Sequence, residues 1–333
     1  MSSSVRLEIL IPTYQRAEVL LQNLEALVGL IRSEGNGEVG IRVRDNASSD
    51  GTADLVREFA AKNSDVPWVV EANQENIGGE PNCIALLEAS ESDYVMYLGD
   101  DDFLPKGYLA FVLNEINTNP NTSVILTGFS ELLPDGSLLP ARFEKFDMLR
   151  IKASDQAMER LMPLGHQLSG LMLKRDGVVE SYLSHSDSRN MYPFMYFVGY
   201  CGRRGDCVYA PKFQVHVSQG ATRHWSYDKS ALMRDMLVNY ELIFSGKPIQ
   251  RWRAQWFLLK RNWARLGGSS ITRLPTAFPH VVFWNRLDWL TRLTLIAISP
   301  FLLARATLGS LARSMGKRKS AHDMLSASAA SSN

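Results

Sequence analysis

We expect an α/β fold with a mainly parallel β-sheet that is covered by helices on both faces. Over residues 5–130, short apolar runs alternate with longer segments in which apolar residues recur at helical spacing. Strands and helices that alternate in this way indicate β-α-β units. In addition, a polar motif follows each of the first four apolar runs, and ligands of such sheets bind beyond the carboxyl ends of the strands.

The expected elements follow from apolar periodicity and from capping residues. The expected strands are Leu7–Ile11, Ile41–Arg44, Trp68–Val70, Tyr94–Leu98, Val124–Thr127, Leu171–Leu173 and Phe213–Val217. The expected helices are Glu18–Ile31, a segment through Leu55, Val56 and Phe59 that Asp50 or Thr52 caps, Pro81–Ala89, Pro105–Ile116 with proline in its first turn, and the buried aromatic run Tyr192–Tyr200.

The charge of the chain is unevenly distributed. The 333 residues carry a formal net charge of +1. From Arg251 to the end there are 13 Lys and Arg residues against two acidic residues, a net charge of +11, so residues 1–250 carry −10. Two oppositely charged parts predict two kinds of partner. The acidic part suits metal-mediated phosphate binding, and the basic part, which is rich in Trp and Leu, suits anionic lipid better than nucleic acid.

The ends and the cysteines indicate a cytoplasmic protein. Residues 1–6 lead into the first apolar run without the pattern of a secretory signal. The three cysteines, Cys83, Cys201 and Cys207, have neither zinc-type nor redox-type spacing, which is typical of reduced thiols. The chain also lacks a Gly-x-Gly-x-x-Gly motif, so a dinucleotide-binding fold has little support.

The most informative motif is a triplet of aspartates, Asp100, Asp101 and Asp102, that follows the apolar run Tyr94–Leu98 and Gly99. Like charges this close repel one another, so the cluster needs solvent or a cation. Mg²⁺ and Mn²⁺ take oxygen ligands and commonly bridge protein carboxylates to phosphates. We interpret the triplet as a metal–diphosphate site, and the alternative is a solvated acidic loop.

Polar motifs also follow the first three expected strands. They are Pro-Thr-Tyr-Gln-Arg at Pro12–Arg16, Asp-Asn-Ala-Ser-Ser-Asp-Gly-Thr at Asp45–Thr52 and Asn-Gln-Glu-Asn-Ile-Gly-Gly at Asn73–Gly79. Each of them alone is typical of a turn or a helix-entry loop. Together with Gly-Asp-Asp-Asp, in this order and spacing, the motifs resemble those of the family-two glycosyltransferases of the GT-A fold. Asn46 departs from the family pattern, because many members have a second aspartate there.

The resemblance implies a role for each motif. The family would place Pro12, Thr13 and Tyr14 against the base and ribose, and Asp45 against a pyrimidine N–H, which favours UDP, dTDP or CDP donors. Asp102 would be the main ligand of Mn²⁺ or Mg²⁺, and Asp101 would support it or contact the donor sugar. The implied nucleotide-binding residues are Pro12, Thr13, Tyr14, Arg16, Asp45, Asn46, Asn76, Gly78, Gly79, Asp100 and Asp101, and the implied metal ligands are Asp102, Asp100 and His216.

An inverting sugar transfer needs a base that takes the proton of the acceptor hydroxyl. In the family an acid, often in a Glu-Asp pair, fills this role downstream of the aspartate motif, but Ser184–Phe194 contains no such pair. Asp187 is therefore the candidate base, and the alternative is that it caps the following helix. His185 is the reserve candidate, since imidazole also acts as a base near neutral pH.

The resemblance also suggests histidine as a third metal ligand, either His216 or His224. A histidine with a structural role in the core is an equally good interpretation of His216. Arg203, Arg204 and Arg223 are candidates for holding a diphosphate, although arginines at the surface are usually solvated.

The basic part contains two apolar segments. Trp252, Trp256, Leu259, Trp263 and Leu266 recur at i, i+4, i+7, i+11 and i+14, which places them on one helix face flanked by cations. This composition is typical of a helix in a membrane interface, and the alternative is packing on the catalytic domain.

Leu293–Ala304 is apolar and lies between Arg292 and Arg305. A helix of this length covers ~18 Å, and Pro300 would kink it, so we expect it to enter one leaflet rather than cross the ~30 Å hydrocarbon core.

We therefore expect a GT-A catalytic domain in residues 1–225, with a nucleotide-binding half (5–130) and an acceptor half (131–225). Residues 226–320 are expected to form a helical membrane-associating region and residues 321–333 a disordered tail. The implied function is metal-dependent transfer of a sugar, which could be a deoxyhexose, from a nucleoside diphosphate to a lipid-linked (polyprenyl diphosphate) saccharide at the inner face of the plasma membrane. The segment Met191–Gly199 resembles a branch of O-antigen enzymes that includes abequosyltransferases.

Two other functions compete with this hypothesis. A sugar-nucleotide nucleotidyltransferase has a similar layered sheet with metal-binding carboxylates, but Pro12–Arg16 is not the Gly-rich loop that such enzymes use for a triphosphate. The missing Glu-Asp pair also leaves open a non-catalytic, nucleotide-binding membrane adaptor.

Overall fold

The computed structural model describes residues 5–139, 147–185, 189–219, 231–262, 274–284 and 286–330. The chain divides into two compact units, Met1–Ser226 and Tyr227–Asn333. Each unit is described by itself.

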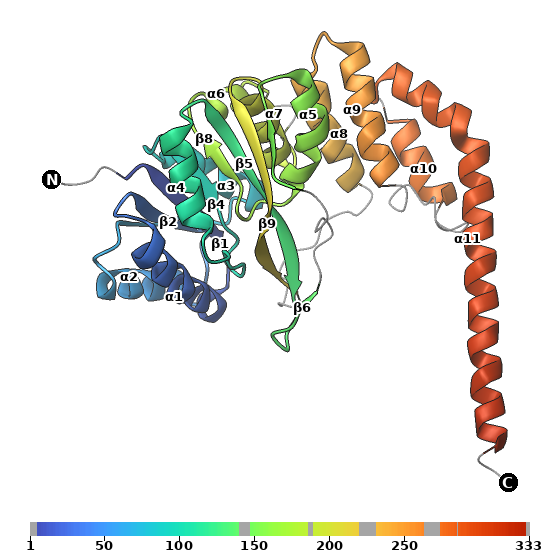
Figure 1. Ribbon diagram of the computed structural model, residues 1–333, viewed down its shortest axis with the longest axis horizontal. Helices are drawn as coiled ribbons and strands as arrows, with labels where there is room; N and C mark the ends of the chain where they lie inside the picture. Colours follow the sequence, from blue (N-terminus) through green and yellow to red (C-terminus); the bar gives the residue numbers. More distant parts are fainter. Residues whose placement is uncertain are drawn as a thin grey trace. The chain divides into compact units, whose positions relative to one another are not determined.

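The first unit is built on one nine-stranded sheet (Figure 1). Its strands follow the order β3-β2-β1-β4-β8-β5-β9-β7, and β6 pairs with β5 beside this path. The bounds of the strands are β1 Leu7–Thr13, β2 Val39–Asp45, β3 Trp68–Ala72, β4 Tyr94–Tyr97, β5 Thr122–Leu132, β6 Leu138–Leu139, β7 Leu149–Ile151, β8 Met172–Lys174 and β9 Asp206–Ser218.

The helices of this unit alternate with the strands through the first half of the sequence, as predicted. Their bounds are α1 Ala17–Glu34, α2 Thr52–Lys62, α3 Gly79–Ala89, α4 Tyr108–Thr118, α5 Asp155–Leu161, α6 Val178–Leu183 and α7 Pro193–Gly202, with a 3₁₀ helix, η1, at Met162–His166. One expectation was wrong: Pro105 does not open α4. Pro105 accepts a backbone hydrogen bond from Tyr108 (3.2 Å) in a turn that contains Gly107 at φ +83°.

The amino-terminal half of the sheet is fully parallel, because β1 pairs in parallel with both β2 and β4, and β2 pairs in parallel with β3. The register places Thr13, the last residue of β1, opposite Asp45, the last residue of β2. The polar motifs that follow these strands therefore leave the sheet at one edge. This is the arrangement that β-α-β connectivity predicts.

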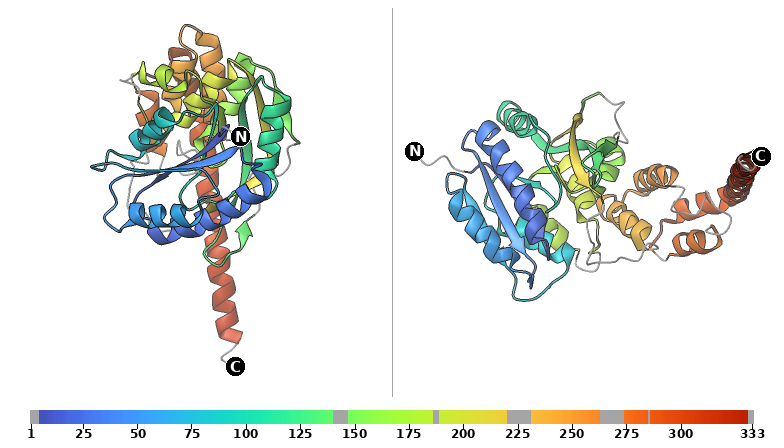
Figure 2. Two further views of the ribbon diagram at one scale, coloured as in Figure 1. Left: turned by 90° about the vertical axis from the view of Figure 1, so that its left-hand side faces the viewer. Right: turned by 90° about the horizontal axis from the view of Figure 1, so that it is seen from below.

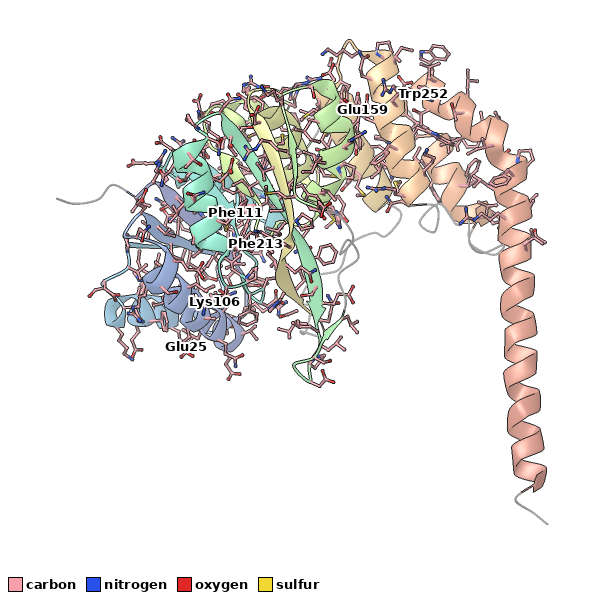
Figure 3. The ribbon with its side chains drawn as sticks, viewed as in Figure 1. Glu25, Lys106, Phe111, Glu159, Phe213 and Trp252 are labelled. Atoms are coloured by element: carbon pink, nitrogen blue, oxygen red, sulfur yellow. The ribbon has the colours of Figure 1, made fainter. Side chains whose placement is uncertain are left out.

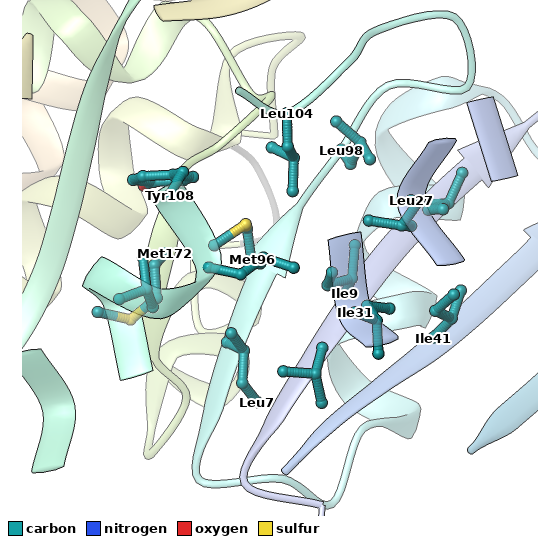
Figure 4. Close-up of a cluster of buried hydrophobic side chains, with 14 of the residues drawn as sticks. Leu7, Ile9, Leu27, Ile31, Ile41, Met96, Leu98, Leu104, Tyr108 and Met172 are labelled. Carbon is teal, nitrogen blue, oxygen red and sulfur yellow. The ribbon is translucent and has the colours of Figure 1, made fainter. Parts of the chain in front are cut away.

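One face of the sheet is covered by α1, α2 and α4. Every second residue of β1 (Leu7, Ile9 and Ile11) is fully buried and belongs to a single core cluster with Leu27 and Ile31 of α1 (Figure 4). Because strand side chains alternate between faces, the intervening residue Leu10 points to the opposite face. The same cluster contains Val56 of α2 and Tyr108, Leu109 and Val112 of α4.

The other face is covered by α3, α6 and α7. Tyr97 of β4 is fully buried, and its ring centroid lies 4.8 Å from that of Phe194 in α7. Its hydroxyl donates to the carbonyl of Cys83 in α3 (2.8 Å), so the one polar atom on this buried ring is satisfied. Every residue of α7 is buried, which confirms the buried helix predicted from the aromatic run.

The carboxyl-terminal half of the sheet is mixed. The short strand β8 lies antiparallel between β4 and β5, and the long strand β9 runs parallel to β5 with an irregularity near Gly128. Expected strands fell within β5 and β9, and a third, Leu171–Leu173, is shifted by one residue from β8, but both long strands extend well beyond the predicted ranges. Phe111 of α4 and Phe213 of β9 pack with ring centroids 4.9 Å apart, which ties the two halves together (Figure 3).

The second unit is helical, as predicted (Figures 1 and 2). Its helices are α8 Ala231–Ile243, α9 Pro248–Arg261, α10 Leu274–Val282 and α11 Trp289–Ala330. Asp288 is buried, accepts a hydrogen bond from Leu290 N (2.9 Å) at the start of α11, and pairs with Arg251 of α9 (2.5 Å).

The apolar stripe expected on α9 packs in part inside this unit. Leu259 is fully buried, and the indole N–H of Trp252 donates to Thr294 Oγ1 of α11 (3.0 Å). Trp263 and Leu266, the last two members of the stripe, lie outside the described residues. Leu259 is therefore covered by the unit itself, whereas Trp252 and Trp256 are half-buried.

The second apolar segment belongs to a much longer helix than expected. Helix α11 spans 42 residues, continues through Pro300, and extends through Ala330 into the part that was expected to be disordered. By length and composition alone, Trp289–Leu308 is long and apolar enough to cross a membrane. The apolar part of the helix is therefore longer than the ~18 Å that was expected from Leu293–Ala304 alone. The residues after Ala304 are rich in Ala, Leu, Lys and Arg, which are strong helix formers.

Candidate functional site

The polar ends of β1, β2 and β4 lie together and are joined by hydrogen bonds. Asn46 N, just after β2, donates to the carbonyl of Thr13 at the end of β1 (2.9 Å). The side chain of Thr13 donates in turn to Asp100 Oδ2 beyond β4 (2.8 Å). The sequence-predicted residues of three separate motifs therefore meet at one edge of the sheet, and Figure 1 shows that edge where these three strands lie side by side.

Asp102 is held from two sides. Ser169, just before β8, donates its hydroxyl to Asp102 Oδ2, and the backbone N–H of Ser218, the last residue of β9, donates to Asp102 Oδ1 (3.1 Å). The Ser169 hydroxyl also accepts a hydrogen bond from Gly99 N (2.9 Å). A Cβ at Gly99 would lie 2.9 Å from Asp102 Oδ2, so glycine is what permits this close approach. We call Asp102, Ser169 and Ser218 the Asp102 clamp.

Asp101 is turned toward the first motif. Its carboxylate lies 3.4 Å from the guanidinium of Arg16, and both side chains are largely buried. Its carbonyl accepts a hydrogen bond from the Ser218 hydroxyl. Ser218 therefore fixes the backbone of Asp101 and the carboxylate of Asp102 at once, and the three aspartates of the triplet point to three different partners.

Burial makes the triplet electrostatically unusual. Burial, reinforced by the charge of Asp101, raises the pKa of Asp100 to about 6. Burial likewise raises the pKa of Asp102 to about 7, against the opposing effect of the hydrogen bond from Ser169 and with help from Asp101. Two carboxylates with raised pKa values at the same edge favour a cation between them, because a cation stabilises the charged form of both.

The oxygen ligands of Asp100 and Asp102 suit a hard divalent cation. Within the described ranges, however, no group of three or more His, Cys, Asp or Glu side chains is arranged to hold a metal ion. The three-ligand set with His216 that the sequence suggested is thus not assembled. A two-carboxylate site fits Mg²⁺ or Mn²⁺ only if phosphate or water oxygens complete the coordination, as they commonly do.

His216 has a backbone role at this site. It lies on β9 and exchanges two backbone hydrogen bonds with Phe103 (3.0 and 2.9 Å), the residue after the aspartate triplet. Burial lowers the pKa of its imidazole. Because side chains alternate along a strand, His216 and Ser218 share one face of β9.

Asn46 is the centre of a network of asparagines. Its Nδ2 donates to Asn76 Oδ1 (2.8 Å) and to the carbonyl of Gly78 (3.3 Å). Its Oδ1 accepts from Asn73 Nδ2 (2.9 Å) and from Ile77 N (3.0 Å). All four bonds go to the loop after β3, and Asn46 is only 3% exposed. Asn46 therefore holds the loop that carries Asn76, Gly78 and Gly79 in its conformation.

The remaining residues of the first two motifs also surround the edge of the sheet. Asp45 is buried, and its carboxylate accepts hydrogen bonds from the backbone N–H (3.0 Å) and the hydroxyl of Ser48. Pro12 and Tyr14 are half-buried. Asp45 and Asp102 thus lie at the same edge of the sheet, as the sequence interpretation requires.

Asp187 lies outside the described residues, as do His224 and Arg223. His185 is half-buried, and its ring lies edge-on to Tyr196 with centroids 5.8 Å apart. Arg203 pairs with Asp155 (3.3 Å), and Arg204 lies over the ring of Tyr200 at 3.5 Å, so the structure gives both arginines local partners.

Sequence reasoning assigned no role to Ser169 or Ser218, and it placed Asn73 in the motif after β3 without a role of its own. Ser169 lies before the antiparallel strand β8, and Ser218 ends β9, so their contact with Asp102 depends on the mixed half of the sheet. Ser169 also lines a cavity of about 10 Å³ with Thr127, His166 and Gln167, which is room for one water molecule and too small for a sugar. A small serine before a short strand carries no signal in a single sequence.

Comparison with known proteins agrees with this architecture. Residues 8–169 match the model of a family described as glycosyl transferase family 2. Abequosyltransferase RfbV of Salmonella typhimurium strain LT2 is 32% identical over 102 residues, which cover 31% of this chain and 30% of that protein. The chain thus aligns with less than a third of the length of this curated relative.

Two solved structures show the same fold. The structure of S. aureus TarS 1-349 in complex with UDP-GlcNAc has a TM-score of 0.66 at 14% identity and covers 93% of this chain and 92% of that one. The mannosyltransferase PcManGT of Pyrobaculum calidifontis, in complex with GDP-Man and Mn²⁺, has a TM-score of 0.52 at 14% identity, with 92% and 83% covered. The predicted GT-A fold is confirmed.

The asparagine network predicts the effect of restoring the more usual aspartate. In an Asn46→Asp variant a buried carboxylate would face Asn76 Oδ1 and the Gly78 carbonyl without a proton to donate. We expect the free energy of unfolding in urea to fall by about 2–3 kcal/mol. Asn114→Asp, on the exposed side of α4, is the matched control and should change it by less than about 0.5 kcal/mol. Equal stability of the two variants would show that the network does not hold the loop.

Proposed function

We propose that this chain transfers a sugar from a nucleoside diphosphate donor to a lipid-linked saccharide, and the match of residues 8–169 to glycosyl transferase family 2 supports this proposal. The observation that carries this proposal is the convergence of Thr13, Asp100 and the Asp102 clamp at one edge of the sheet. The diphosphate of the donor is negatively charged, so a cation bound at that edge would attract it. The donor pocket is formed by residues 5–130 and the acceptor side by residues 131–225.

The donor is a pyrimidine nucleoside diphosphate sugar. Asp45 is buried beside Thr13, at the position where the family resemblance places the base, and a carboxylate can accept a hydrogen bond from a ring N–H. Relatives of the same fold support a nucleotide sugar in general, since TarS was solved with UDP-GlcNAc and PcManGT with GDP-Man. The abequosyltransferase relative supports a deoxyhexose among the candidate sugars.

Asp100 and Asp102 are the residues that would hold Mn²⁺ or Mg²⁺, with phosphate or water oxygens in the remaining positions. PcManGT was solved with Mn²⁺, which supports this choice of metal. The bound ion supplies positive charge that stabilises the departing nucleoside diphosphate. The clamp keeps the Asp102 carboxylate in one orientation, and the pair of Arg16 and Asp101 places a guanidinium at the same edge.

The acceptor side supplies the base and the membrane setting. Asp187 is the candidate that takes the proton of the acceptor hydroxyl, with His185 in reserve, and transfer is then inverting. The basic second unit suits a membrane-held, negatively charged acceptor, so we place the protein at the cytoplasmic face of the inner membrane. Assembly of a cell-surface polysaccharide such as O-antigen is the setting that fits a lipid-linked saccharide.

Loss of the clamped carboxylate should abolish transfer. With Mn²⁺, a panel of nucleotide sugars and lipid extract as acceptor, Asp102→Ala should lower the release of nucleoside diphosphate on the order of 100-fold. Asp102→Asn, which keeps the volume of the side chain, guards against misfolding. Asp65→Ala is the control, because Asp65 is an exposed carboxylate that pairs with Arg32.

The products identify the function. If the chain instead joins a nucleoside triphosphate to a sugar 1-phosphate and releases pyrophosphate, nucleotidyl chemistry would replace sugar transfer. If the chain binds nucleotide but turns over no donor, the remaining interpretation is a non-catalytic, nucleotide-binding adaptor.

The base assignment makes a separate prediction. Asp187→Asn should lower the rate of transfer while leaving the dissociation constant of the donor unchanged, because the base contacts the acceptor hydroxyl rather than the nucleotide. The measurement is the transfer rate at saturating donor alongside calorimetry with UDP and Mn²⁺. Full activity of Asp187→Asn, combined with loss in His185→Gln, would move the role to the histidine.

The raised pKa values predict that protons and metal compete. Without metal, Asp100 and Asp102 bind protons up to pH values near 6 and 7, above the range of unfolded aspartate, so stability from these groups is lost as pH rises through that range. When metal is present, stability rises with pH instead, because the metal binds only the charged carboxylates. The increase in melting temperature caused by Mn²⁺ with UDP should therefore be larger at about pH 8 than at about pH 6. An equal increase at both pH values would contradict metal binding by these two groups.

A further inference from the structure

Helix α11 has an uncharged apolar face that the described residues leave exposed. Trp289, Leu293, Ile296 and Leu303 are 60%, 56%, 47% and 51% exposed. They recur at i, i+4, i+7 and i+14, which places them on one side of the helix. Phe301 (64%) and Leu308 (67%) lie beside this stripe. We call these six side chains the outer face of α11.

The opposite side of the same helix is packed. Thr291, Leu295, Leu302 and Ala306 are all 0% exposed. Leu302 and Ala306 belong to a small core cluster with Leu274 of α10. A helix that is apolar on both sides needs a second apolar environment, either a protein partner or a membrane.

Charge indicates which of these partners fits. Arg292 and Arg305 flank the outer face, and the sequence contains neither Asp nor Glu between Trp289 and His322. Four further cations, Arg313, Lys317, Arg318 and Lys319, follow in the sequence. A protein surface usually presents both signs of charge, whereas the cytoplasmic leaflet is uniformly anionic and attracts basic segments.

We propose that the outer face of α11 lies in the interface of an anionic lipid bilayer, with the helix axis parallel to the membrane plane. Trp289 then sits at headgroup depth at one end of the apolar stripe, and the flanking arginines reach lipid phosphates. This surface differs from the α9 stripe that the sequence suggested, in which Leu259 is buried. The inference rests on the proposed function only in that a lipid-linked acceptor requires the protein at a membrane.

The packed side of α11 decides between lying on the membrane and crossing it. The Thr291 hydroxyl donates to Gln255 Oε1 of α9 (2.7 Å), and both residues are fully buried. Helix α9 also carries Arg251, Arg253, Lys260 and Arg261. A crossing α11 would either break this buried contact or draw α9 and its cations into hydrocarbon, where each charge is costly. Only the outer face can be buried in lipid without either change.

Vesicle binding tests the surface. The full chain should co-sediment with vesicles of phosphatidylglycerol and phosphatidylcholine, less with phosphatidylcholine alone, and less as salt is raised. The double variant Leu293→Ser, Ile296→Ser should bind about tenfold or more weakly, because two apolar side chains no longer enter lipid. Leu55→Ser removes an equally apolar, exposed side chain from α2 and should bind as the unmodified chain does.

The outcomes keep this proposal separate from the proposed function. Asp102→Ala should lose donor turnover yet keep vesicle binding, and the α11 double variant should keep metal-dependent hydrolysis of the donor in detergent-free buffer. The second result also shows that the double variant is folded. Unchanged vesicle binding by the double variant, or no binding by the full chain, would overturn the membrane surface while leaving the transferase proposal in place.

Depth measurements test the orientation. All three native cysteines are buried, so single cysteines introduced by Leu293→Cys and Phe301→Cys can be labelled selectively with a fluorophore. A helix parallel to the membrane places both labels at one shallow depth, where lipids brominated near the headgroup quench them equally. A crossing helix places the label at 301 near the bilayer centre, and stronger quenching there by deeply brominated lipid would overturn the parallel orientation.

Discussion

The structure of the site depends on holding three adjacent carboxylates in place although they repel one another. The chain does this by giving each aspartate its own partner: Thr13 for Asp100, Arg16 for Asp101, and Ser169 with the backbone of Ser218 for Asp102. These partners come from β1, the loop after it, the segment before β8 and the end of β9. The triplet therefore forms in its observed geometry only when both halves of the sheet are assembled. The remaining electrostatic cost appears as the raised pKa values of Asp100 and Asp102.

A second set of polar contacts connects the interior of the parallel sheet to the loop after β3. Arg42 pairs with the buried Glu8 (3.1 Å), and Arg44 bonds both Glu71 (3.1 Å) and Asn73 (2.9 Å). Asn73 continues to Asn46, whose amide holds Asn76 and Gly78. Buried polar groups must be fully paired to be tolerated, and such pairing fixes one arrangement of the groups. The loop that would contact a donor sugar is thus shaped by the strands, and an asparagine at position 46 has a structural reason.

The sequence could predict the contacts that follow from neighbouring β-α-β units, and it could not predict those made by distant segments. The parallel strands, their order of motifs and the meeting of Thr13, Asp45 and Asp100 follow from β-α-β connectivity, which a single sequence displays through its periodicity. Ser169 and Ser218 could not be found in this way, because their contact with Asp102 depends on an antiparallel strand inserted between β4 and β5. His216 was selected for its chemistry, yet the structure connects it to the site through backbone bonds to Phe103. In the second unit, periodicity identified apolar stripes correctly but could not tell which stripe packs inside.

The stripe on α9 and the outer face of α11 have similar composition and the same helical spacing, so hydrophobicity alone does not distinguish them. Polar pairs between the two helices do distinguish them. Trp252 donates to Thr294 and Thr291 donates to Gln255, and these bonds orient the two helices so that Leu259 of the α9 stripe is buried. The rotation of α11 is then set, because Thr291, Leu295 and Leu302 share the side that packs. The uncharged side that includes Leu293 and Ile296 must consequently face outward. As at the aspartate triplet, a few directional bonds determine which surface remains available to a ligand.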